Sequence, residues 1–155
     1  ARIEPMMVKQ KPFVQSFNGG SGARLLQKGE ADLVIASNGD IARIMADDPV
    51  IGFTIPREGS LLASTNLCIA KGTKHPKNAH ALIDYLLDGK SAMALFEAND
   101  LPITNAVART SLGNSYAENG ALSPPAERLA KCEFAEFSAE LESLFHEAFT
   151  RIRAA

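Results

Sequence analysis

The chain has few of the residues that form disulfides or aromatic contacts: it has no tryptophan, two tyrosines and two cysteines among 155 residues. Cys68 and Cys132 are too few for a disulfide framework or a zinc knuckle. Because Cys68 lies in an apolar run, we expect it to be a buried, inert thiol. No apolar run approaches the roughly 18 residues that a transmembrane helix needs. These absences leave an ordinary globular protein as the expectation.

A strong charge of one sign is also absent. The chain has 16 basic and 18 acidic residues, a formal net charge of −2. Scattered charges of both signs argue against an electrostatic nucleic-acid surface, so no nucleic-acid partner is expected. The first five residues, Ala1 to Pro5, are neither a signal peptide nor a start methionine. We therefore expect a processed chain or a piece of a longer one.

Catalytic and metal-binding motifs are missing as well. His75, His80 and His146 do not have the spacing of a metal-binding pair. No nucleophile elbow, phosphate-binding loop or supported Cys–His pair is present. Carboxylates follow helix faces, which is typical of solvated charge. The sequence thus predicts no enzyme, no metal and no cofactor.

What the chain does have is an alternation of short apolar runs and helical patterns. Helices are predicted over 21–28, 41–46 with Asp40 as a cap, 76–88 with Pro76 at its start, and 91–99. Gly89 is expected to end the third of these. A buried strand is predicted over 33–36 and a second strand over 50–55. The runs 61–63 and 67–70 are predicted to be two strand pieces of one crossing segment. The fold class is therefore α/β.

The last third of the chain divides into a loop, a connection and one long helix. Thr104 or Asn105 is expected to cap a short helical turn, and the aperiodic segment 112–125 to be a surface connection. An amphipathic C-terminal helix is predicted from apolar positions that recur at helical spacing, with core packing as the favoured role. These positions are Phe134, Phe137, Leu141, Leu144, Phe145, Ala148, Phe149 and Ile152.

Ligand binding is most plausible where a predicted strand ends and a helix begins. Ser37, Asn38 and Asp40 follow the run 33–36, and open α/β sheets bind ligands at the carboxyl ends of strands. A plain capped turn is an equal alternative for this segment. The Gly-rich segment 18–22 before a helix also has an anion-binding alternative, although a flexible loop is favoured there.

Three segments together resemble the periplasmic spermidine/putrescine-binding proteins of bacterial ABC importers. The first is GEADLVIASNG at 29–39, and the second is PREGSLL at 56–62 with its continuation NLCIAKG at 66–72. The third is KHPKNAHALIDYLL at 74–87, and PITNA at 102–106 also matches a short family motif. The similarity extends over about residues 18 to 150, in the same order as in the family.

This resemblance implies a two-lobed, periplasmic-binding-protein-like fold of type II, with three layers in each lobe. Residues 1–56 would be the end of the second lobe, and 57–155 a hinge crossing followed by helices that return towards the first lobe. The chain would then be a fragment that lacks the first lobe. The resemblance also implies a periplasmic location, a small-molecule ligand, closure of the lobes around it, and an ABC permease of the inner membrane as partner.

The family's ligand-contact positions differ in this chain. Where polyamine binders place aromatic and acidic groups, this sequence has Ser37, Ala63 and Thr65, and a later polar position falls near Ala135. We therefore expect a small polar organic ligand rather than spermidine or putrescine. The expected contacts are Ser37, Asn38 and Asp40, with Ser64 and Thr65 on the crossing strand.

Two other functions remain open from the sequence. One is an anion-binding protein of the same fold, for example for an organophosphonate, with the loop 19–22 and Arg24 or Arg43 as partners of the anion. The other is a ligand-sensing regulatory domain, because similar two-lobed folds also serve as sensors.

Overall fold

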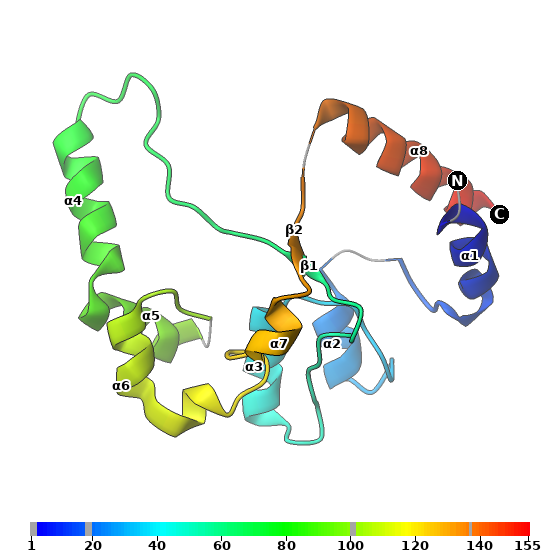
Figure 1. The fold of residues 1–155 in the computed structure, drawn as a ribbon, viewed down its shortest axis with the longest axis horizontal. Helices are drawn as coiled ribbons and strands as arrows, with labels where there is room; N and C mark the ends of the chain where they lie inside the picture. The colour runs from blue at the N-terminus through cyan, green and yellow to red at the C-terminus, as the bar shows by residue number, and fades with distance from the viewer. Residues whose placement is uncertain (1–2, 18–19, 100–101, 137) are drawn as a thin grey trace.

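The computed structural model describes residues 3–17, 20–99, 102–136 and 138–155, and it shows a mixed α/β chain with an open shape (Figure 1). Its eight α-helices and two short strands among the described residues occur in the following order. They are α1 (Ile3–Gln10), α2 (Gly22–Gln27), α3 (Asn38–Asp47), β1 (Leu61–Leu62), α4 (Pro76–Leu87), α5 (Gly89–Asn99), α6 (Ala106–Ala117), α7 (Ala126–Leu129), β2 (Glu133–Phe134) and α8 (Ala139–Ala154). A 3₁₀ turn at Lys11–Phe13 follows α1.

Two arms extend from a central body. The body holds α2, α3, α7 and the strands, and one arm is built by α4, α5 and α6 (Figure 1). In the other arm α1 packs on α8, so that the two ends of the chain lie together. Arg151 and Glu4 tie this pair through two hydrogen bonds of 2.9 and 3.1 Å. Lys11 Nζ adds a 2.7 Å hydrogen bond to the Arg153 carbonyl.

The core is small and joins α3 to α5 and α6. Ala42, Tyr116, Ala121 and Leu122 are buried together, and Phe96 packs edge-to-face on Tyr116 with ring centroids 5.4 Å apart. The Tyr116 hydroxyl accepts a 3.1 Å hydrogen bond from the Ile103 N–H. The prediction of a surface connection over 112–125 is therefore wrong. Tyr116 and Leu122 are core residues. Because their sequence neighbours are polar, no apolar periodicity marks them.

Most of the helix predictions are confirmed. α2, α4 and α5 lie where the patterns placed them, and Asn105 caps α6 by accepting a hydrogen bond from the Ala108 N–H at 2.9 Å. Gly89 begins α5 instead of ending α4, because Asp88 breaks the helix with an extended backbone. The cap of α3 is Ser37, with Asp40 inside the first turn.

Three of the four strand predictions are wrong for the described chain. Of the four predicted runs, only 61–63 contains a strand, β1, which pairs in parallel with β2. The runs 33–36, 50–55 and 67–70 form no strand. Leu33 is 91% exposed and Ile35 fully exposed. A strand needs a neighbouring strand for its backbone groups, and among the described residues no strand pairs with these runs. Cys68 is likewise exposed rather than buried.

The C-terminal helix is shorter and less covered than its pattern predicted. It starts at Ala139, so Phe134 belongs to β2, and Phe137 lies outside the described residues. Ile152 is buried, as predicted, but Leu144 and Phe145 are 55% and 70% exposed. The core role predicted for this stripe is wrong for those two positions. The described contacts of α8, with α1 and between Phe17 and Phe149, leave both side chains exposed.

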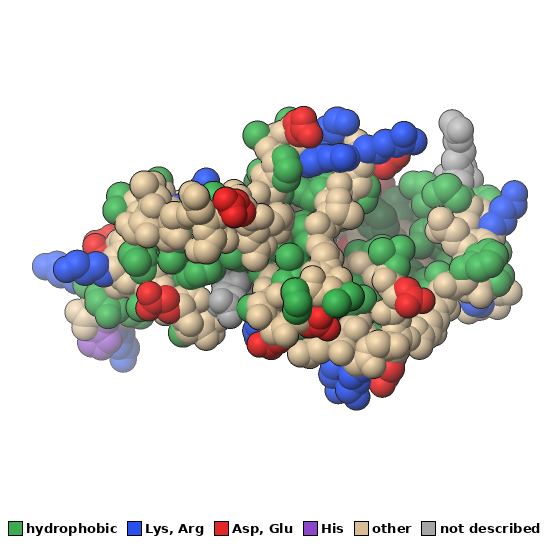
Figure 2. Space-filling model, turned by 90° about the horizontal axis from the view of Figure 1, so that it is seen from below, with side chains coloured by type: hydrophobic (Ala, Val, Ile, Leu, Met, Phe, Trp, Pro, Cys, Tyr) green, Lys and Arg blue, Asp and Glu red, His purple; other side chains and the backbone are tan. Residues whose placement is uncertain are grey.

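The exposed surface is far larger than that of a compact protein of this size. The chain exposes 12306 Å², whereas a folded monomer of its 16.6 kDa exposes about 7,600 Å². Hydrophobic side chains are spread over the face seen in Figure 2. The described elements therefore bury too little surface to form a closed globule.

Candidate functional site

Ser37 and Asp40 form a capping pair at the start of α3. The Asp40 N–H donates to Ser37 Oγ at 3.2 Å, and Ser37 Oγ donates to Asp40 Oδ2 at 2.8 Å. The other carboxylate oxygen of Asp40 accepts a 3.0 Å hydrogen bond from Arg43. Both carboxylate oxygens thus already have partners. The capped turn that the sequence offered as an alternative is present, and a ligand would have to compete with these bonds or add to them.

Asn38 ties α3 to the turn that follows α6. Its Nδ2 donates a 2.9 Å hydrogen bond to the Ala121 carbonyl, and Ala121 is fully buried. The Asn119 side chain stabilises the same turn by accepting from the Ala121 N–H at 2.9 Å. Asn38 therefore has a structural partner far along the chain, which sequence spacing alone does not reveal.

Ser64 and Thr65 lie in the extended segment after β1, and both are exposed. Ser64 Oγ donates to Asn66 Oδ1 at 3.4 Å, and the Asn66 amide donates back to the Ser64 carbonyl at 3.2 Å. Among the hydrogen bonds of the described residues, none joins this segment to the start of α3. The structure thus brings Ser37 and Asp40 together but leaves Ser64 and Thr65 as a second, separate group.

The crossing of β1 and β2 brings two backbone segments close together near these residues. Gly59 has a φ of +105°, and a Cβ atom added there would overlap the Lys131 carbonyl oxygen. Lys131 Nζ donates a 2.9 Å hydrogen bond to the Arg57 carbonyl, which holds the two chain segments side by side. A positive φ and a close approach both require glycine at this position. This crossing lies at the predicted start of the hinge.

Two exposed ion pairs shift pKa values in the described chain. The hydrogen bonds from Arg151 lower the pKa of the Glu4 carboxyl, and those same bonds raise the pKa of Arg151. The side-chain hydrogen bond from Arg57 lowers the pKa of Glu58 beside the β1–β2 crossing. None of these groups is one of the predicted ligand contacts.

No group of three or more His, Cys, Asp or Glu residues in the described chain could hold a metal ion. None of its helices combines the length and apolar character needed to cross a membrane.

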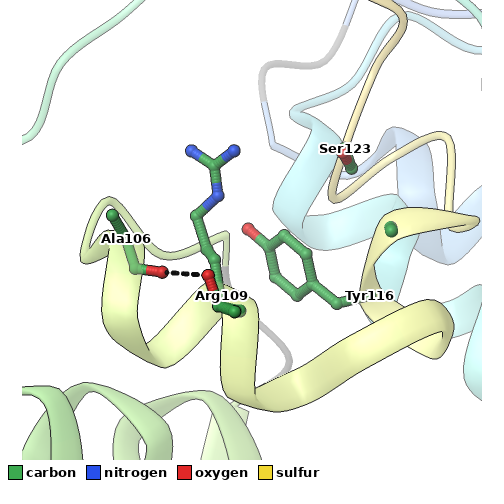
Figure 3. Close-up of a pocket in the computed structure, with 6 residues that line it drawn as sticks. Ala106, Arg109, Tyr116 and Ser123 are labelled. Atoms are coloured by element: carbon green, nitrogen blue, oxygen red, sulfur yellow. Dashed lines mark hydrogen bonds between the residues drawn. The ribbon is translucent and has the colours of Figure 1, made fainter.

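One group of polar residues was missed by the sequence analysis. Arg109, Thr110, Tyr116 and Ser123 line an open surface cavity of about 260 Å³ between α6 and the following turn (Figure 3). No motif marks these positions, and they come together only because α6 bends at Gly113. A second cavity of about 270 Å³ lies beside α8 and is lined by Glu136, Leu141, Glu142 and Phe145.

Sequence comparison supplies the class of protein. Residues 6–124 match the family model of bacterial extracellular solute-binding proteins, so the chain belongs to that family. The resemblance noted from the sequence is thereby confirmed.

The relatives are polyamine binders by name. The chain is 26% identical over 149 residues to spermidine/putrescine-binding periplasmic protein 1 of Haemophilus influenzae, covering 96% of this chain and 41% of the relative. It is 29% identical to the putrescine/cadaverine-binding protein of Pseudomonas aeruginosa, covering 84% of this chain and 38% of the relative. It is 27% identical to the spermidine/putrescine-binding periplasmic protein of Escherichia coli, covering 94% of this chain and 42% of the relative. The chain thus spans about two fifths of the length of these relatives.

Proposed function

We propose that this chain is part of the substrate-binding component of a bacterial ABC importer of the polyamine-like class. It acts in the periplasm by capturing a small polar organic solute and delivering it to a permease, and it performs no chemistry. The family match over residues 6–124 is the observation that carries this proposal. The names of the relatives support a location and ligand class of the same kind.

The working unit in this proposal is a two-lobed protein of which this chain supplies one portion. Residues 1–56 end the second lobe, and 57–155 cross the hinge and return towards the first lobe, each lobe being a three-layer α/β unit. The large exposed area and the bare runs at Leu33–Ile35 and Leu67–Ile69 support it, because such runs are typical of strands buried inside a parallel sheet. The remaining sheet strands would come from the rest of the complete natural polypeptide.

Ligand capture in this scheme occurs between the lobes. Ser37, Asn38 and Asp40 at the head of α3 would contact the solute from one side, and Ser64 and Thr65 from the crossing segment. The β1–β2 crossing near Gly59 provides a narrow connection about which the lobes close. Closure stabilised by bound solute would present a distinct surface to the permease.

The structure also bears on the ligand's charge. Asp40 is the one carboxylate among the five proposed contacts, and Arg43 and Ser37 already bind its oxygens. A diammonium ligand needs free carboxylates at both ends. We therefore expect a small polar solute with a weaker cationic character than putrescine.

Calorimetric titration of the complete natural polypeptide with putrescine, spermidine, amino acids and phosphonates tests this function. Thr65→Val removes one proposed contact without breaking any hydrogen bond of the described chain. We expect this substitution to lower the affinity for the solute about tenfold, as loss of one good hydrogen bond does. Thr150→Val on α8, whose hydroxyl bonds only its own helix at His146, is the matched control and should leave affinity unchanged.

Three outcomes contradict parts of the proposal. Micromolar binding of putrescine overturns the expected ligand class while leaving the transport role intact. Equal loss of affinity in Thr65→Val and Thr150→Val overturns the contact assignment. The absence of saturable binding for all four classes overturns the solute-capture role itself.

A further inference from the structure

The cavity beside α6 has a shape imposed by one kink. Gly113 has a φ of 64° and a ψ of −147°, so α6 changes direction between Arg109 and Tyr116. The two side chains then stand next to each other on one wall, and Ser123 faces them from the turn that follows the helix (Figure 3). Ala106, Thr110 and Ala117 complete the lining.

The polar lining offers donors and one positive charge. Arg109 provides a guanidinium with five N–H donors, and none of the six described lining residues is acidic. Thr110 is already committed, because its hydroxyl donates to the Ala106 carbonyl at 2.9 Å. The Tyr116 hydroxyl donates to the Ile103 carbonyl only at 3.4 Å, beyond the ordinary O–H···O range, so its hydrogen can turn to a better acceptor.

The far wall of the cavity is held in place by the rest of the fold. The Ser123 N–H donates to the Asn119 carbonyl at 2.8 Å, and the Ala121 carbonyl two residues earlier accepts from the Asn38 amide at 2.9 Å. Tyr116 is 4% exposed and packs on Phe96. The Ser123 backbone and the Tyr116 ring are thus held in place before any ligand arrives, which lowers the entropic cost of binding.

We propose that this cavity binds a small carboxylate, with Arg109 gripping the two carboxylate oxygens and Ser123 and Tyr116 donating to them. A single planar guanidinium matches a carboxylate in charge and in geometry. The methyl groups of Ala106 and Ala117 face the short apolar part of the ligand. The volume of about 260 Å³ lies just below the pockets that take drug-sized molecules, so the ligand has few heavy atoms. This site shares no residue with the proposed contacts at 37–40 and 64–65, and it stands whether or not the proposed function does.

Titration of the complete natural polypeptide with sodium propionate tests the site, at constant ionic strength kept with sodium chloride. Because Arg109 is exposed, we expect saturable binding with a Kd on the order of 1 mM. Arg109→Gln should weaken binding by at least about tenfold, since it removes a charge-assisted pair of hydrogen bonds. Arg109→Lys keeps the charge but loses the planar fork, and should give an intermediate loss.

Arg128→Gln is the matched control, because Arg128 carries the same charge on α7 and does not line the cavity. It should bind propionate as the unaltered protein does, and circular dichroism should show the same melting curve for all variants. Ser123→Ala tests the other wall and should weaken binding several-fold.

The proposal is overturned if propionate shows no saturable binding, or if Arg109→Gln binds as well as the unaltered protein. Equal weakening by Arg128→Gln would reveal attraction to general positive charge rather than a site. Tighter binding of inorganic phosphate than of propionate would overturn the carboxylate class.

Discussion

Two regions of this molecule have similarly apolar sequences but bury their apolar side chains to different extents. The helices α3, α5 and α6, with the turn after α6, bury Ala42, Tyr116 and Leu122 against one another. The apolar runs at 33–35 and 67–69 are at least as hydrophobic, yet their side chains are largely exposed. The helices satisfy their backbone hydrogen bonds within themselves, whereas a strand needs a neighbour. The contrast separates segments that are packed within the described chain from segments that we propose are packed by the rest of a longer protein.

The strongest test of the packed region is Tyr116→Ala. It removes a ring that is 4% exposed and its contact with Phe96. We expect the free energy of unfolding of the complete natural polypeptide to fall by about 3–5 kcal/mol, as for other buried aromatic residues. Urea denaturation measures this loss. Tyr116→Phe keeps the ring and should cost only about 1 kcal/mol for the hydroxyl; equal losses in both variants would contradict a packing role.

For the exposed apolar runs, the expected effect of a substitution on stability depends on which protein is measured. Ile35 is fully exposed in the described chain, so Ile35→Ala should change the stability of the 155-residue chain by less than about 0.5 kcal/mol. In the complete natural polypeptide, where we propose that the run is a buried strand, the same change should cost about 2–4 kcal/mol. Urea denaturation of both proteins checks this pair. Equal small effects in both would end the proposed contrast.

The crossing between the two regions can be tested at Gly59. Gly59→Ala introduces a Cβ that overlaps the Lys131 carbonyl and an unfavourable positive φ. Gly72→Ala is the matched control, because Gly72 has a φ of +87° but nothing within 4 Å of its Cβ position. We expect about 1–2 kcal/mol from the positive φ in both variants, and a larger loss for Gly59→Ala in thermal denaturation. Losses of the same size would show that the close approach to Lys131 carries no cost.

The smallest expected effect concerns the pair of helices at the chain ends. Arg151 lowers the pKa of Glu4 in the folded protein, so this pair stabilises the fold above the ordinary glutamate pKa of about 4.3. The contribution is lost as the pH falls through the lowered pKa of the folded state. Melting temperatures measured between neutral pH and pH 3 should show a slightly weaker acid dependence in Glu4→Gln. Identical profiles, or a profile unaffected by added salt, would contradict the pairing.

The helices could be predicted from the sequence because their signals are local. Pro76 at a first turn and Asn105 at a cap act within a few residues, and both predictions agree with the structure. The strands could not, because Leu33 and Ile35 show only that a segment prefers to be buried and do not show what buries it. The burial of Tyr116 could not be predicted for a related reason. Its partners Phe96 and Ile103 lie more than ten residues earlier in the chain.

The candidate site was predicted less completely than the helices. The cap formed by Ser37 and Asp40 could be anticipated from a small polar run before a helix. The long-range bond from Asn38 to Ala121 and the meeting of Arg109, Tyr116 and Ser123 could not, because both depend on the bend of α6 at Gly113. A positive φ at a single glycine has no periodic pattern to announce it.

Amide hydrogen exchange in residues 33–36 and 67–70 tests the central claim most directly, which is that these runs are strands completed by another part of a two-lobed solute-binding protein. The 155-residue chain and the complete natural polypeptide would be compared under the same conditions. We predict exchange near the unprotected rate in the 155-residue chain and strong protection in the complete polypeptide. Equally fast exchange of these amides in both proteins would contradict the account.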